Sequence, residues 1–152
     1  MTEILWHGRG GQGAFTAARI LGAAAVRSGG YALAFPSFGP ERRGAPMRAF
    51  TKLDNSPISD RSEITAPSFT VYLDETLAPD NALSDDAALI PAPEDYAAAA
   101  RNRLPTVNTI LLARLAKRLG FSADSIVGAI EDVMPEKIRK RNADAVLEAL
   151  NA

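Results

Sequence analysis

The hydrophobic pattern of the first 35 residues predicts a strand, a glycine-rich turn, a helix and a second strand. Thr2–His7 contains a short apolar run that stops at glycines, which is typical of a buried strand. Apolar and alanine side chains then recur at helical spacing over Ala14–Arg27, and Ser28–Gly30 provides a helix stop. Tyr31–Phe35 again has the composition of a strand. This β-loop-α-β order favours a parallel, right-handed pairing of the two strands.

Proline and glycine separate the strands expected in the middle of the chain. Pro36–Pro46 holds too many turn residues for regular structure. Met47–Leu53 alternates between two sets of side chains, and Ser68–Leu73 is β-branched and aromatic, so both predict strands. A short apolar piece at Ala88–Ile90 predicts an edge strand inside an acidic, proline-broken stretch.

Helical signals dominate the last third of the chain. An apolar stripe begins at Val107 and ends before Gly120, Ser122 can cap the next helix, and Pro135 suits the first position of a final helix. The order of elements predicts a single domain over residues 1–152. We expect a three-layer α/β fold with a mostly parallel sheet and a Rossmann-like beginning.

The overall charge and hydropathy exclude two classes of partner. With 17 basic and 18 acidic residues, the net charge of −1 provides no field that would attract nucleic acid. No run of about 18 apolar residues is present that could span a bilayer. Glu3, followed directly by a strand-like run, is unlike a signal peptide. We therefore expect no nucleic acid, no membrane and a cytoplasmic location.

Cysteine and histidine counts limit the chemistry of this chain more strongly. The sequence has no Cys and one His. Iron–sulfur clusters are held by Cys thiolates, and a structural zinc site needs four Cys, His or acidic ligands. If the protein takes part in redox or metal chemistry, another chain must supply the centre.

A glycine-rich motif stands between the first strand and the first helix. Gly8, Gly10 and Gly13 satisfy G-x-G-x-x-G, a pattern that lets the backbone approach a phosphate at a helix N-terminus. A dinucleotide site also needs an acid at the end of the second strand, and Phe35 and Pro36 stand there instead. Three hypotheses remain for this glycine loop, residues 8–13: a nucleotide site, a tight turn for close packing, or a site for another anion.

A second loop gathers charge between rigid and permissive residues. Gly39–Pro46 reads GPERRGAP, and its two adjacent guanidiniums suit a carboxylate or phosphate. We call residues 39–46 the arginine loop. It is either a solvated surface loop with a local ion pair or a ligand-binding loop at the carboxyl edge of the sheet, facing the same edge as the glycine loop.

Two further features have ordinary structural explanations. His7 stands at a strand end, and we expect a hydrogen-bonded scaffold role because no nucleophile accompanies it. The basic cluster Lys137–Arg141 predicts the solvated face of a helix, with Ile138 turned inward.

At these two loops the sequence resembles a known family. The segments HGRGGQGAFTAARIL (residues 7–21) and FPSFGPERRGAPMRAFTKLD (residues 35–54) resemble the gamma subunit, or gamma domain, of pyruvate and related 2-oxoacid:ferredoxin oxidoreductases. The similarity is dense over residues 3–54 and resumes at Asn108 and over Ile130–Asn142. The GPERRGAP form is closer to the pyruvate or branched-chain type than to the 2-oxoglutarate type.

The resemblance implies an enzyme made of several subunits that converts a 2-oxoacid and CoA to acyl-CoA and CO2. It implies thiamine diphosphate, Mg and iron–sulfur clusters on the alpha, beta and ferredoxin-like partner subunits, with ferredoxin or another acceptor taking the electrons. This chain alone would bind no cofactor and show no activity. The residues that would face CoA, the active site or a subunit interface are those of the two loops: Gly8, Arg9, Gly10, Gly11, Gln12, Gly13, Glu41, Arg42 and Arg43.

The region between Asp74 and Asn108 departs from the family pattern. It is shorter than the family predicts, which puts one parallel strand in doubt and could mark a subfamily for an aromatic 2-oxoacid. Exposed aromatic residues, expected at Phe35, Phe38 and Phe50, predict a large apolar contact with partner subunits. The alternatives to an oxidoreductase subunit are a stand-alone nucleotide-binding module and a scaffold subunit whose loops only make contacts.

Overall fold

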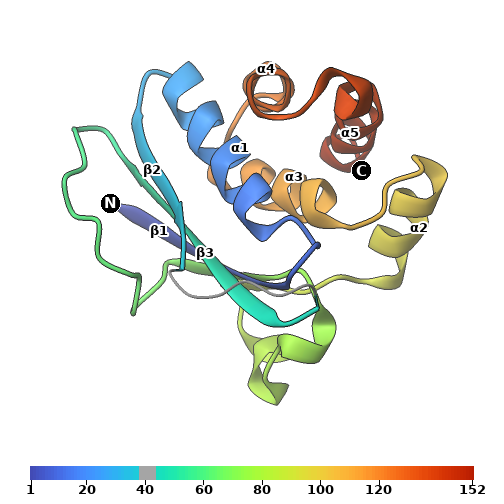
Figure 1. Ribbon diagram of the computed structural model, residues 1–152, viewed down its shortest axis with the longest axis horizontal. Helices are drawn as coiled ribbons and strands as arrows, with labels where there is room; N and C mark the ends of the chain where they lie inside the picture. The colour runs from blue at the N-terminus through green and yellow to red at the C-terminus, as the bar shows by residue number, and fades with distance from the viewer. Residues whose placement is uncertain (38–43) are drawn as a thin grey trace.

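The computed structural model describes residues 1–37 and 44–152, and in this part of the chain a five-stranded sheet carries helices on one face (Figure 1). The strands are β1 (Thr2–Arg9), β2 (Tyr31–Pro36), β3 (Pro46–Asp54), β4 (Phe69–Tyr72) and β5 (Ala88–Leu89). Their order across the sheet is β2-β3-β1-β4-β5. The arginine-loop residues Glu41, Arg42 and Arg43 lie outside the described residues, as does Phe38.

The strand directions confirm an α/β fold with a mostly parallel sheet and correct one detail of it. β4 pairs parallel with β1, and β5 with β4. β3 runs antiparallel to both β1 and β2, so β1 and β2 point the same way but do not touch. The predicted direct pairing of β1 with β2 is therefore wrong. β3 lies between them because its residues Ala49–Leu53 are buried on both faces, as a central strand requires.

The helices form two layers above the sheet. They are α1 (Ala14–Arg27), α2 (Pro93–Arg101), α3 (Asn108–Leu119), α4 (Ala123–Val133) and α5 (Glu136–Leu150). α1 packs on β2 and β3, α4 packs on α1, and α5 packs on α3. The three layers are thus the sheet, the α1/α3 layer and the α4/α5 layer, with both helical layers on the same face of the sheet (Figure 1). Within residues 1–37 and 44–152, no helix is both long and apolar enough to cross a bilayer.

The helix boundaries follow the local signals closely. Gly120 ends α3 in the left-handed conformation, with φ of 82°. The Ser122 side chain caps α4 by accepting a hydrogen bond from the Ser125 N–H. Pro135 is the N-cap of α5, whose first helical residue is Glu136, so it lies one position before the place predicted for it. These agreements arise because caps depend on residues that are close in sequence.

Small residues let α1 approach the sheet closely. A Cβ on Gly22 would lie 3.4 Å from the Cβ of Ala32, which is ordinary contact with no room to spare. A chain of two buried hydrogen bonds also joins α1 to the sheet. Trp6 donates to the Thr51 hydroxyl at 3.0 Å, and Thr51 donates to the Ala18 carbonyl at 3.0 Å. The core therefore contains a satisfied hydrogen-bond chain, which fixes how α1 lies on the sheet.

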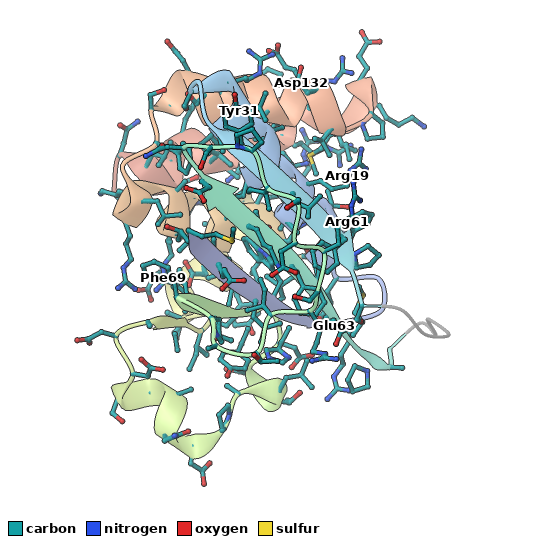
Figure 2. All side chains as sticks on the ribbon, turned by 90° about the vertical axis from the view of Figure 1, so that its left-hand side faces the viewer. Arg19, Tyr31, Arg61, Glu63, Phe69 and Asp132 are labelled. Carbon is teal, nitrogen blue, oxygen red and sulfur yellow. The ribbon has the colours of Figure 1, made fainter. Side chains whose placement is uncertain are left out.

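The other face of the sheet carries the segment 55–68 and no helix of the described chain. Arg61 and Glu63 of this segment lie over the strands (Figure 2). Beneath it Phe50 is completely buried, so the expectation that this residue is exposed is wrong. Phe35 is half-buried and packs on Phe50 with ring centroids 5.0 Å apart. The segment covers what would otherwise be a bare apolar face.

The short region between Asp74 and Asn108 still contains the strand that was in doubt. β5 pairs with β4 over two residues and completes the sheet, as Ala88–Ile90 predicts. Two short 3-10 helices, η1 (Glu75–Leu77) and η2 (Asp80–Ser84), precede it. Helix α2 was not anticipated from the sequence. It begins with Pro93, and the Asp95 carboxylate caps it by accepting the Ala92 N–H at 2.8 Å.

Candidate functional site

The glycine loop is a tight turn, and its glycines stand there for different physical reasons. Gly8 lies within β1 rather than in the turn, and its backbone faces the Ala14 side chain of α1. Gly11 and Gly13 have positive φ values of 94° and 80°. A Cβ on Gly13 would lie 2.3 Å from Nδ2 of Asn108, the residue that begins α3. A larger residue at position 13 would combine a strained backbone with this collision, which supports the tight-turn hypothesis for this loop.

Gln12 connects this turn to the neighbouring strand. Its Oε1 accepts the Arg9 N–H at 2.7 Å, and its Nε2 donates to Oδ2 of Asp74 at 3.0 Å. Asp74 directly follows β4, the parallel neighbour of β1. The side chain of Gln12 therefore holds both ends of the turn against the carboxyl edge of the sheet.

Asp74 is the centre of this network. Its Oδ1 accepts the backbone N–H and the hydroxyl of Thr76 at 2.9 and 2.6 Å, and its Oδ2 lies 3.2 Å from Nε of Arg9. The Thr76 hydroxyl, followed by the Thr76 N–H, Gln12 and Arg9, lowers the pKa of the Asp74 carboxyl below its usual range. The carboxylate is thus ionised at neutral pH, and its charge is shared with Arg9.

The hydrogen bonds of the Asp74 carboxylate argue against the hypothesis of a nucleotide-binding module. That hypothesis lacked an acid at the end of the strand next to β1. The structure places Asp74 at such a position, because β4 is the parallel neighbour of β1. Both oxygens of Asp74 already accept hydrogen bonds from Thr76 and Gln12, so the carboxylate holds the protein's own loop rather than standing open for a ribose.

The described end of the arginine loop, Gly44 and Ala45, lies on the glycine loop. Gly10 donates to the Ala45 carbonyl at 2.9 Å, and Gly44 donates back to the Gly10 carbonyl at 3.1 Å. Arg9 also donates to the Gly44 carbonyl at 3.3 Å. Gly44 and Ala45 are the last residues of the loop before β3, so the two loops meet at one edge of the sheet, as expected. The roles of Glu41, Arg42 and Arg43 lie beyond what the described residues show.

Two cavities flank the glycine loop. One, of about 350 Å³, is lined by Gln12, Asp74 and Tyr96, and the other, of about 460 Å³, by Gly11 and Gly13. The segment Leu104–Thr106 borders both of them. The glycine loop is therefore the partition between two separate hollows. We call them the Asp74 cavity and the Arg141 cavity, after a charged residue that lines each.

Tyr96 makes the Asp74 cavity a place for hydrogen bonding. Its side chain is 43% exposed, and partial burial, followed by the charges of Glu75, Asp74 and Asp95, raises the pKa of its phenol. The hydroxyl thus remains protonated at neutral pH and can donate. The Gln12 amide and the Asp74 carboxylate in this cavity are bonded to each other, so the Tyr96 phenol is the group there that can orient a ligand.

His7 lies apart from both cavities. Its ring stacks on Tyr72 with centroids 5.0 Å apart and an angle of 5° between the planes. Burial, and then the nearby charge of Arg48, lower the pKa of His7, so the ring is neutral at physiological pH. The ring of His7 thus packs by aromatic stacking on Tyr72, rather than through the hydrogen bond expected for it.

Sequence reasoning did not identify four residues of this region as site residues. Asp74 and Asn108 hold the glycine loop, while Arg19 and Arg141 line the Arg141 cavity. An acid directly after a strand next to the motif was a usable signal for Asp74. Arg141 was assigned to a solvated helix face, but its half-buried side chain lines the cavity.

Comparisons with known proteins agree on one family. The family model described as pyruvate ferredoxin/flavodoxin oxidoreductase matches residues 3–90. The pyruvate synthase subunit PorC of Methanothermobacter thermautotrophicus is 41% identical over 165 aligned positions, covering 95% of this chain and 92% of the relative. The Pyrococcus furiosus pyruvate/ketoisovalerate oxidoreductases common subunit gamma is 38% identical, covering 98% of this chain and 95% of the relative.

A solved structure shows the same architecture. The crystal structure of pyruvate oxidoreductase subunit PORC from Thermotoga maritima superposes with a TM-score of 0.73 at 28% identity. It covers 99% of this chain, and this chain covers 95% of it. The aligned length of 165 positions exceeds the 152 residues of this chain, so the Methanothermobacter relative has residues that this chain lacks.

Proposed function

The chain belongs to the pyruvate ferredoxin/flavodoxin oxidoreductase family as a gamma-type subunit, and from this premise we propose that it serves in a complex that oxidises a pyruvate-type 2-oxoacid. The reaction joins the acyl group of the 2-oxoacid to CoA, releases CO2 and passes electrons to ferredoxin or a similar acceptor. The observation that carries this proposal is the match to two gamma-type relatives over nearly the whole of both chains.

In this proposal, other subunits of the complex hold its redox centres. The sequence has no cysteine, so it contains no thiolate for an iron–sulfur cluster. Among residues 1–37 and 44–152, no group of three or more His, Cys, Asp or Glu side chains is placed to hold a metal ion. The donor set of this chain does not fit an iron–sulfur cluster. We assign these groups to alpha, beta and ferredoxin-like partners.

We further propose that the edge formed by the two loops contacts CoA or the active site of a partner. The contribution of this chain would be binding and orientation, because the described residues hold a preorganised turn and no nucleophile–base pair. Gln12 and Asp74 fix the turn, and Gly44 and Ala45 dock the arginine loop on it. Arg42 and Arg43 would then present charge to CoA phosphates or a partner carboxylate, with Glu41 orienting them.

Two other functions were open at the level of the sequence. A scaffold subunit that makes contacts only, including one for an aromatic 2-oxoacid, would share the fold but not need the charge of the arginine loop. A stand-alone nucleotide module would need a free acid next to the glycine loop, and Asp74 is already bonded. We place the working complex in the cytoplasm, with no nucleic-acid or membrane partner.

Purification of the tagged chain from its native source tests the proposal. The expected result is a stable complex with Cys-rich and thiamine-dependent partners that oxidises pyruvate only when CoA is added. Native mass spectrometry would give the composition, and a ferredoxin-linked assay the activity. Recovery of the chain as a monomer, or of a complex without 2-oxoacid oxidation, would contradict the proposal. Equal rates with and without CoA would contradict its CoA part.

A further inference from the structure

The Arg141 cavity contains positive charge that no described acid neutralises. Arg19 of α1 and Arg141 of α5 both line it, and no Asp or Glu is among its lining residues. Every ion pair in residues 1–37 and 44–152 involves other cations, so neither guanidinium has an acidic partner within 4.0 Å there. Elsewhere in the fold arginines pair with acids, as Arg27 does with Asp132. The cavity therefore favours an anion.

The neighbouring contacts leave both arginine side chains able to bind a ligand. The guanidinium of Arg19 lies 5.6 Å from the ring centroid of Phe15, and Arg19 is exposed at the side of the molecule (Figure 2). Arg141 is half-buried and makes one long hydrogen bond, 3.4 Å, to the carbonyl of Arg103. A carboxylate would give each of them a charge-assisted hydrogen bond in place of water.

Part of the lining of this cavity is apolar. Leu104 before α3, Met134 in the α4–α5 connection and Ile138 of α5 contribute hydrocarbon to it. The polar residues Asn108 and Asn142 also line the cavity, but each is bonded to neighbouring protein groups and forms part of the wall. Cations on one part of the lining and hydrocarbon on another are complementary to an anion with an apolar tail.

We propose that the Arg141 cavity is a binding site for a small monocarboxylic acid with an aliphatic tail, held by Arg19 and Arg141. Its volume of about 460 Å³ lies in the range of small-molecule sites. The N-terminus of α1 adds to the preference for a negative head group, since no side chain caps it and Gly13 at its N-cap lines the cavity. The cavity borders the glycine loop through Gly11 and Gly13, but the proposal does not rest on the proposed function.

Calorimetric titration of the full chain with hexanoate tests the site, with acetate as the acid lacking a tail and 1-hexanol as the tail lacking a charge. We expect saturable binding of one hexanoate per chain and at least about tenfold weaker binding of either control. Arg19→Ala and Arg141→Ala should each weaken hexanoate about tenfold. Lys137→Ala removes an exposed charge from the same helix as Arg141 and should change nothing.

Several outcomes would overturn the site. They are the absence of saturable hexanoate binding, equal binding of acetate, and unchanged hexanoate binding in both arginine variants. Circular dichroism checks that each variant is folded. If one of them is not, methyl NMR of the parent chain decides, because hexanoate must shift the signals of Met134 and Ile138. Unmoved methyl signals at saturating hexanoate would reject the site.

Discussion

The side chain of Gln12 donates to the carboxylate of Asp74 across 3.0 Å, although 62 residues separate them in sequence. Through this bond the turn after β1 is fixed to the end of the neighbouring strand β4. Gln12 also accepts the Arg9 N–H, so one amide closes the turn and anchors it. The glycine loop, which has the clearest sequence motif of the chain, is therefore held in place by Asp74, a residue outside that motif.

Replacement of Asp74 by Asn should loosen the glycine loop in a pH-dependent manner. The hydrogen bonds to Asp74 lower its folded pKa, so its stabilisation is complete above the unfolded value near about pH 3.9 and is lost as the pH falls through the folded pKa. We expect Asp74→Asn to cost about 1–2 kcal/mol of unfolding free energy at neutral pH and progressively less below about pH 4. Urea unfolding across pH measures this, with Asp86→Asn, an exposed acid, as control. A deficit that does not change with pH would contradict the role of the charge.

Gly13→Ala tests the packing of the glycine loop, and Gly29→Ala, at the end of α1, is its matched control. Both glycines have positive φ, 80° and 90°, so each alanine costs about 1–2 kcal/mol in backbone strain. Only at Gly13 would the new Cβ collide with a side chain, that of Asn108, whereas nothing lies within 4 Å at Gly29. We expect Gly13→Ala to be less stable than Gly29→Ala by a further ~1–2 kcal/mol in urea unfolding. Equal losses would mean that Asn108 moves aside without cost.

Lys52→Met should release the segment 55–68 from the sheet. Lys52 is 1% exposed, donates to the Asp60 carbonyl at 3.1 Å and lies 3.8 Å from a carboxylate oxygen of Glu3. Methionine fills the space but cannot donate, so amide hydrogen exchange around Asp60 should become roughly fivefold faster or more. Lys140→Met, at an exposed site, is the control. Unchanged exchange in Lys52→Met would show that apolar packing alone holds the segment.

Arg43→Ala tests the arginine loop within the assembled complex. A lost charge-assisted hydrogen bond of about 1.5–3 kcal/mol should raise the apparent KM for CoA about tenfold or more, or weaken assembly, without unfolding the chain. Size-exclusion profiles and CoA kinetics separate these two results, and Arg61→Ala, an exposed arginine of segment 55–68, is the control. If Arg42→Ala and Arg43→Ala complexes both assemble and turn over like the parent, the loop is a solvated surface.

The isolated chain should be colourless and inactive towards 2-oxoacids. The reason is chemical, because a chain without cysteine has no thiolate to hold an iron–sulfur chromophore. Absorbance in the visible region and pyruvate-dependent reduction of ferredoxin measure this on the purified chain. Either signal, once contaminating partner subunits are excluded by mass spectrometry, would refute it.

Short-range signals made much of this fold predictable from the sequence. The turn at Gly11–Gly13, the helix stop at Gly120 and the cap at Ser122 depend on residues within about one helical turn of each other, so a linear reading captures them. The β-loop-α-β beginning and the absence of cysteine likewise follow from sequence alone. Together they indicated an α/β domain without an iron–sulfur centre of its own.

Long-range pairing was decided only by the tertiary structure. β3 lies between β1 and β2, and segment 55–68 covers its Phe50 and Lys52, although both alternate along the strand as exposed residues would. Sheet order depends on which strand can bury two faces, and this competition between distant segments leaves no mark on local spacing. Asp74 reached the glycine loop, and Arg141 reached the cavity beside it, for the same reason. The sequence determined which chemical groups this protein has, while packing between distant elements determined which of them meet.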